Sequence, residues 1–142
     1  MSTSSPQTPS VLFVCNTNGG KSQIAAALLR QVAGDSVAVK SAGLIPAHQI
    51  NELAASVVQA VGADMRAEVP TALTEEALRA ADRVVIVGEA QVPYLEGVAM
   101  ERWVPAEAPA DLATERERME FLRDDIAARV TALNDELGTA TF

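Results

Sequence analysis

Short continuous apolar runs alternate with stretches of helical spacing along most of this chain. Residues 11–14 and 84–87 are uninterrupted apolar runs bounded by polar residues or glycines, as expected for strands buried on both faces of a parallel sheet. Residues 37–40 alternate between apolar and other side chains, which predicts a second strand that ends before Ala42. An apolar patch within residues 98–103 predicts a fourth strand.

The segments between these strands have apolar residues at the 3.6-residue spacing of helices. One helix is predicted from Ser22 to near Gly34, and another over residues 50–61. Thr74 is placed to cap a short third helix, and Thr114 opens the last helix with capping-box spacing. The buried faces of the first and last helices are predicted to comprise Ile24, Leu28, Leu29 and Val32, and Met119, Leu122, Ile126, Val130, Leu133 and Leu137.

This alternation of strands and helices predicts a three-layer α/β/α fold with a mostly parallel four-stranded sheet. A chain of 142 residues that is 49% hydrophobic can build one core, so we expect a single domain over residues 11–138. Residues 1–10 are rich in Ser, Thr and Pro and predict a disordered tail. Because no long apolar segment or basic leader is present, we expect a soluble, cytoplasmic protein that does not enter membranes.

Charge and cysteine content narrow the chemistry. A formal net charge of −8 argues against nucleic acid as a partner, because phosphate backbones are bound by clustered Lys and Arg. Cys15 is the only cysteine and His48 the only histidine, so an internal disulfide or a Cys/His zinc cluster cannot form. We expect no metal and no bound cofactor. His48 lies between a turn and a helix, where a solvated or capping role is expected.

The segment between the first strand and the first helix, residues 15–22 with the sequence CNTNGGKS, is typical of an anion site. Ligands of α/β sheets bind beyond the carboxyl ends of strands. The two glycines and Asn18 tolerate backbone angles that turn successive N–H groups inward, and the unpaired amides of the following helix face the same point. A tetrahedral oxyanion is therefore predicted to bind Asn16, Thr17, Asn18, Gly19, Gly20, Lys21 and Ser22.

Cys15 is predicted to be the nucleophile in this loop, because a helix N-terminus stabilises a thiolate. Ser22 is placed to donate a hydrogen bond to the sulfur, and Lys21 adds a positive charge for the anion. A cysteine at the end of a buried strand is more often a small core residue. That alternative gives no reason for two glycines, an asparagine, a lysine and a serine to follow, so we favour the catalytic interpretation.

Residues 15–22 also match the nucleotide-binding pattern G-x-x-x-x-G-K-[ST] at every fixed position except the first, where Cys15 replaces glycine. A nucleotide-binding module is therefore an alternative. Such modules normally add a metal-orienting Asp at the end of another strand, whereas residues 84–87 are followed by Gly88 and Glu89.

The chain resembles the low-molecular-weight protein tyrosine phosphatase fold and the arsenate reductases built on it, over nearly all of residues 11–137. The resemblance rests on the strand into Cys15, on Asn18 and Ser22, on residues 41–43 (SAG), and on Trp103 followed by an acidic, proline-containing loop. Three segments look most like the single-cysteine arsenate–mycothiol transferases of actinobacteria. These are residues 18–23 (NGGKSQ), 82–86 (DRVVI) and 101–103 (ERW).

Two departures separate the chain from a phosphatase. The phosphatase loop closes with an arginine, whose planar fork Lys21 cannot reproduce. Phosphatases also have an Asp-Pro acid in the late loop, but Ala108 precedes the proline here. The nearest carboxylates, Glu107 and Asp111, are the candidate general acids. A phosphatase of weakened activity is therefore a second alternative.

The resemblance implies an arsenate reductase of the thiol-transferase type that serves arsenic detoxification. Because Cys15 is alone, reduction through an intramolecular disulfide cascade is excluded and an external thiol must complete the reaction. The implied cosubstrate is mycothiol, which would take up arsenic as an arseno–mycothiol adduct, and mycoredoxin would then release arsenite. Two roles for Cys15 stay open: a covalent bond to arsenic, or organisation of the site.

Overall fold

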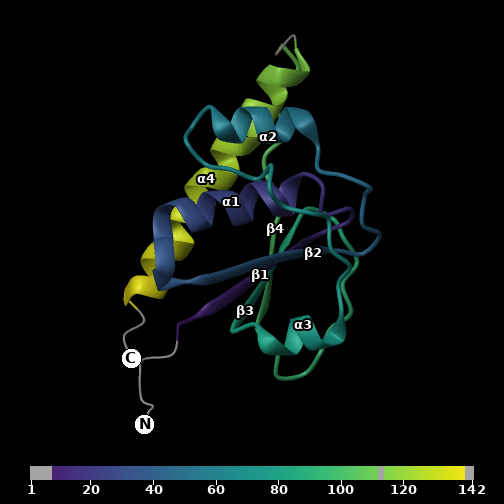
Figure 1. The fold of residues 1–142 in the computed structure, drawn as a ribbon, viewed down its shortest axis with the longest axis vertical. Helices are drawn as coiled ribbons and strands as arrows, with labels where there is room; N and C mark the ends of the chain where they lie inside the picture. The colour runs from purple at the N-terminus through teal and green to yellow at the C-terminus, as the bar shows by residue number, and fades with distance from the viewer. Residues whose placement is uncertain (1–7, 112–113, 140–142) are drawn as a thin grey trace.

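The computed structural model describes residues 8–111 and 114–139. In these residues four parallel strands form one sheet in the order β2-β1-β3-β4 (Figure 1), which confirms the predicted parallel sheet. The two central strands are almost entirely apolar because both faces of the sheet are covered. The strands are β1 (Ser10–Cys15), β2 (Ala38–Gly43), β3 (Arg83–Val87) and β4 (Met100–Trp103).

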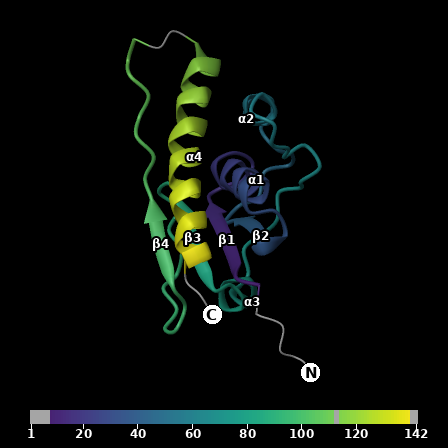
Figure 2. The ribbon, with the colours of Figure 1, turned by 90° about the vertical axis from the view of Figure 1, so that its left-hand side faces the viewer.

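Helices cover both faces of this sheet, which confirms the predicted three-layer architecture. The helices α1 and α4 pack on one face with α2 beside them, and the short α3 packs on the other (Figures 1 and 2). None of the helices in the described ranges is long and apolar enough to cross a membrane. They are α1 (Lys21–Ala33), α2 (Glu52–Gln59), α3 (Glu75–Ala80) and α4 (Glu115–Thr139), with a 3₁₀ turn at Gly34–Ser36.

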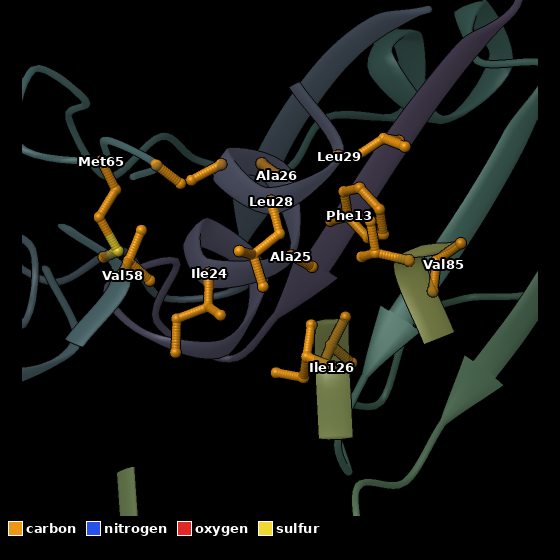
Figure 3. Packing of buried hydrophobic residues seen from close by; sticks show 14 of the residues in the cluster. Phe13, Ile24, Ala25, Ala26, Leu28, Leu29, Val58, Met65, Val85 and Ile126 are labelled. Carbon is orange, nitrogen blue, oxygen red and sulfur yellow. The ribbon is translucent and has the colours of Figure 1, made fainter. Parts of the chain in front are cut away.

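The larger core lies between the sheet and the α1–α4 layer. Phe13 and Ile126 are fully buried there, and Figure 3 shows them in one cluster with Val85. The ring of Phe13 packs against Trp103 with 5.6 Å between ring centroids, so both aromatic residues belong to the core. Val32 does not: it is 48% exposed at the rim of a surface cavity, which corrects its predicted place on the buried face of α1.

Long-range pairing moves two strand boundaries away from their predicted positions. The strand β1 begins at Ser10, inside the predicted tail, because Ser10 pairs with Ala38 in the parallel ladder, and Ser10 N also donates to Asp82 Oδ2 at 2.8 Å. Residues 1–7 lie outside the described residues. The strand β2 continues through Ala42 and Gly43, because Gly43 pairs with Cys15 in the parallel ladder. The glycine that resembled a strand breaker is therefore part of the sheet.

A local cap shortens the second helix. Asn51 Oδ1 accepts a hydrogen bond from Ala54 N at 2.9 Å, so α2 begins at Glu52 rather than Ile50. The predicted caps of the other helices are confirmed: Thr74 accepts from Ala77 N, and Thr114 exchanges hydrogen bonds with Glu117.

Candidate active site

The loop after β1 is tied down through its carbonyl oxygens. Their partners are the main-chain N–H groups of residues 44–51, a segment that follows β2 and leads into α2. This leaves the N–H groups of the loop available to a ligand. Four hydrogen bonds make the connection: Leu44 N to Cys15 O at 3.2 Å, Ile45 N to Asn16 O at 2.8 Å, Ala47 N to Thr17 O at 2.9 Å and Asn51 N to Gly19 O at 2.7 Å.

Several N–H groups of the loop and of the first turn of α1 have no acceptor among the described residues. They belong to a nest of donors at the positive end of a 13-residue helix. Such an arrangement binds tetrahedral oxyanions without any cationic side chain. The free donors are the main-chain N–H groups of Asn16, Thr17, Gly20, Lys21, Ser22 and Gln23.

Cys15 lies under this loop and is only 6% exposed. Asn18 N donates to Sγ at 3.2 Å, and Ser22 Oγ lies 3.0 Å from Sγ. Asn18 Nδ2 donates to the same Ser22 Oγ at 2.8 Å, so the hydroxyl proton of Ser22 is directed towards the sulfur. Two donors therefore converge on Cys15 Sγ, and the position of Ser22 matches the hydrogen bond predicted for it.

Asn18 is the residue that shapes the loop. Its φ is 54°, so the predicted left-handed conformation is confirmed for Asn18 but not for the glycines that follow it. Its side-chain oxygen accepts from Gln23 Nε2 at 3.2 Å and from Thr71 N at 2.8 Å. The glycines that follow therefore have another role than a left-handed backbone. A Cβ on Gly20 would meet nothing within 4 Å, so glycine at this position keeps the entrance to the anion site free of a side chain.

Gly43 is required by the close approach of β2 to the loop. A Cβ at this position would lie 2.7 Å from Asn18 N and 2.8 Å from the carbonyl carbon of Thr17. Because both are main-chain atoms, no side-chain rotation could relieve the contact. This steric demand explains the glycine of the SAG segment.

A cavity of about 380 Å³ opens above Cys15. Lys21 reaches across it towards Gly88: a Cβ on Gly88, which has φ +102°, would lie 3.3 Å from Lys21 Nζ. Arg102 Nη1 holds this turn by donating to Gly88 O at 2.6 Å. The bare glycine therefore provides the surface on which the lysine side chain rests.

The structure brings together some predicted site residues and separates others. Asn16, Thr17, Gly19, Gly20 and Lys21 line the cavity with Cys15. The side chains of Asn18 and Ser22 are fully buried beneath it. The main-chain N–H of Ser22 is available to an oxyanion, whereas that of Asn18 donates to Cys15 Sγ.

The two candidate general acids occupy different places. Glu107 lines a second cavity, of about 420 Å³, that also contains Lys21. Asp111 is exposed and lines neither cavity, so the geometry favours Glu107. His48 is exposed, in line with its expected solvated position.

Sequence reasoning missed three kinds of contributor. Thr71 N donates to Asn18 from a loop 53 residues away, and no local sequence pattern predicts this contact. Gln49 and Asn51 form one wall of the cavity, and only the Asn51 cap had a detectable signal. Glu89 also lines the cavity; its position directly after a buried strand was the available signal.

The main ion-pair network lies away from this site, at the beginning of β3. A hydrogen bond to Glu136 raises the pKa of Arg83 above its usual value, and Glu101 adds to the effect. Because parallel strands place their beginnings opposite their ends, this network stabilises the edge of the sheet remote from Cys15.

Comparison with known proteins agrees with this geometry. The family model for low molecular weight phosphotyrosine protein phosphatase matches residues 10–139. The thioredoxin-dependent arsenate reductase of Corynebacterium glutamicum superposes with a TM-score of 0.78 at 31% identity over 94% of this chain. The match covers 63% of that protein, so this chain spans less than two thirds of its length.

Two further structures have the same fold. An arsenate reductase from Archaeoglobus fulgidus has a TM-score of 0.71 at 26% identity, with 88% of this chain and 98% of that one covered. A tyrosine phosphatase from Escherichia coli K30 in complex with sulphate has a TM-score of 0.72 at 20% identity, with 93% and 100% covered.

These matches confirm the fold and the family that the loop around Cys15 suggested, and they give no support to the nucleotide-binding alternative. The family match extends from the first strand to the last helix. The chain belongs to the low molecular weight phosphotyrosine protein phosphatase family.

Proposed function

We propose that this protein is an arsenate reductase of the thiol-transferase type. The observation that carries the proposal is the sulfur of Cys15, the only thiol of the chain, held by Asn18 N and Ser22 Oγ beneath a nest of free N–H groups. Arsenate is a tetrahedral oxyanion of the kind that such a nest binds. The arsenate reductases among the similar structures support this choice of oxyanion.

In the proposed reaction the nest and Lys21 bind arsenate and withdraw charge from its oxygens. This makes arsenic a better electrophile. A thiol sulfur then forms a bond to arsenic while one As–O bond breaks, and the departing oxygen leaves as water with the thiol proton and the proton of that arsenate hydroxyl. Arsenic stays pentavalent in this step. Glu107 is the candidate group that passes the thiol proton to the departing oxygen.

Reduction needs two thiols, and the chain provides one. In our proposal mycothiol accepts the arsenic, either directly or from an S–As bond first formed by Cys15. A second thiol, on mycoredoxin, then attacks the sulfur of the adduct. A disulfide forms, the S–As bond breaks, and its electron pair stays on arsenic, which leaves as arsenite. The sum is one arsenate and two thiols giving one arsenite, one disulfide and one water.

The test follows mycothiol with and without arsenate. We expect arsenate-dependent consumption of mycothiol and an adduct of the mass of arseno–mycothiol, both lost in Cys15→Ser. Exclusive turnover with thioredoxin, in the absence of any small thiol, would contradict the transferase assignment. That arm is needed because the related protein of Corynebacterium glutamicum is thioredoxin-dependent.

A phosphatase of weakened activity is the second candidate, because the matching family model is that of a phosphatase and the nest suits phosphate equally well. Lys21 is a point charge, whereas an arginine would donate two parallel hydrogen bonds to a phosphoryl group. If the loop is limited by its cation, Lys21→Arg should increase hydrolysis of p-nitrophenyl phosphate. Absence of hydrolysis in both forms would exclude this candidate.

A further inference from the structure

The second cavity adjoins the oxyanion-binding loop of residues 15–22, called the cradle below, and shares Lys21 with the cavity above Cys15. Its walls come from residues 105–108, which follow β4, and from the first turns of α4, where Arg118 and Phe121 lie. Figure 2 shows the chain after β4 running beside α4. A volume of about 420 Å³ falls within the range of small-molecule sites, and an arsenate ion held in the nest does not need this space.

The basic side chains of this second cavity lack acidic partners among the described residues. Neither Lys21 nor Arg118 forms an ion pair with a carboxylate of the described residues, although the chain has a net charge of −8. Both are therefore available as donors to a ligand. The arginines that do form ion pairs are Arg30, Arg66, Arg79, Arg83, Arg116, Arg123 and Arg129.

The remaining walls set the polarity of the occupant. Glu107 adds an acceptor to the two cationic donors, and Phe121 and Leu122 add apolar surface. Hydroxyl groups can accept from Arg118 and donate to Glu107 at once. The cavity therefore suits a small molecule with several hydroxyl or amide groups.

We infer that the second cavity binds the non-reacting part of the small-thiol cosubstrate. The thiol end then enters the cradle past Lys21, which borders both cavities. This inference rests on the proposed function and deepens it, because it selects a polyhydroxylated small thiol, the chemistry of mycothiol, over a protein thiol. The transfer step itself is the one written above, with the sulfur taking the place of one arsenate oxygen.

Arg118→Ala tests the inference, and Arg116→Ala is its matched control. The two arginines are two positions apart on α4 and thus on opposite sides of the helix. Arg116 is engaged elsewhere, donating to Ser56 Oγ at 2.8 Å and pairing with Glu120. Both variants remove one positive charge, but only Arg118 lines the cavity.

Steady-state kinetics with mycothiol and with 2-mercaptoethanol separate cavity binding from chemistry. Losing a charge-assisted hydrogen bond should raise the KM for mycothiol by about tenfold in Arg118→Ala. The KM for arsenate and the rate with 2-mercaptoethanol, which is too small to reach the cavity, should not change. Arg116→Ala should match the wild type. Ala108→Phe, which fills the cavity from its loop wall, should reproduce the loss for mycothiol alone.

An unchanged KM for mycothiol in both Arg118→Ala and Ala108→Phe overturns the inference and leaves the proposed function intact. Equal losses with mycothiol and 2-mercaptoethanol also overturn it, because the cavity would then act on the chemistry rather than on the bound thiol. If the wild type consumes no small thiol with arsenate, the proposed function itself fails.

Discussion

Replacing Gly43 with alanine should damage the oxyanion cradle more than the fold. The new Cβ would lie 2.7 Å from Asn18 N, and ordinary contact begins at 3.4 Å. The strand and the loop must therefore separate by about 0.7 Å. The loop is the weaker partner, because β2 is held in the ladder with β1 along its whole length.

The magnitudes follow from this displacement. Overpacking of a buried contact typically costs about 1–3 kcal/mol in the free energy of unfolding. The effect on the site should be larger, because Asn18 N donates to Cys15 Sγ at 3.2 Å. Misplacing a reacting group by about 1 Å can reduce a rate by about a hundredfold.

Two assays separate these effects without relying on the proposed reaction. Urea unfolding measures stability, and alkylation of Cys15 by iodoacetamide in increasing arsenate or phosphate measures how well the cradle binds an oxyanion. We expect half-protection to require at least about ten times more oxyanion in Gly43→Ala. Gly138→Ala is the control, because a Cβ at this position meets nothing within 4 Å. The higher helix propensity of alanine should stabilise α4 slightly. Unaltered stability together with unaltered protection in Gly43→Ala would refute the steric argument.

Two further predictions concern the network and the core. Asn18→Ala removes hydrogen bonds to Ser22, Gln23 and Thr71 and puts alanine at φ 54°. It should lower the free energy of unfolding, measured in urea, by about 2–4 kcal/mol. It should also weaken the protection of the thiol by oxyanion. Ile126→Ala empties a fully buried position of α4; we expect a loss of about 2–5 kcal/mol in the same assay with oxyanion protection retained, and the reverse pattern would contradict the division between core and site.

The fold was largely predictable because its central signals are local. The continuous apolar runs of β1 and β3 and the caps at Thr74 and Thr114 depend on neighbouring residues, and all of them are confirmed. Boundaries set by distant partners were not predictable in the same way. Gly43 has the local character of a breaker, yet it belongs to β2 because Cys15 pairs with it.

The site was predictable where chemistry and sequence coincide. Cys15 and Ser22 lie on one loop, and their contact at 3.0 Å follows from the helix that begins between them. The amide of Thr71 and the carboxylate of Glu89 reach the site through the sheet topology instead. No spacing in the sequence connects Thr71 to Cys15, so only the folded chain reveals it, whereas the place of Glu89 directly after a buried strand was a usable signal.

The hydrogen bonds that anchor the loop to residues 44–51 join main chain to main chain. These hydrogen bonds therefore do not depend on the side chains of the segment, provided that proline does not replace a donor. Ile45 is 78% exposed and can be substituted. Mutation can thus redraw the rim of the site, and with it the choice of substrate, while the nucleophile keeps its setting. A directed-evolution library confined to the exposed residues Ile45, His48 and Gln49 should yield altered selectivity with few inactive members.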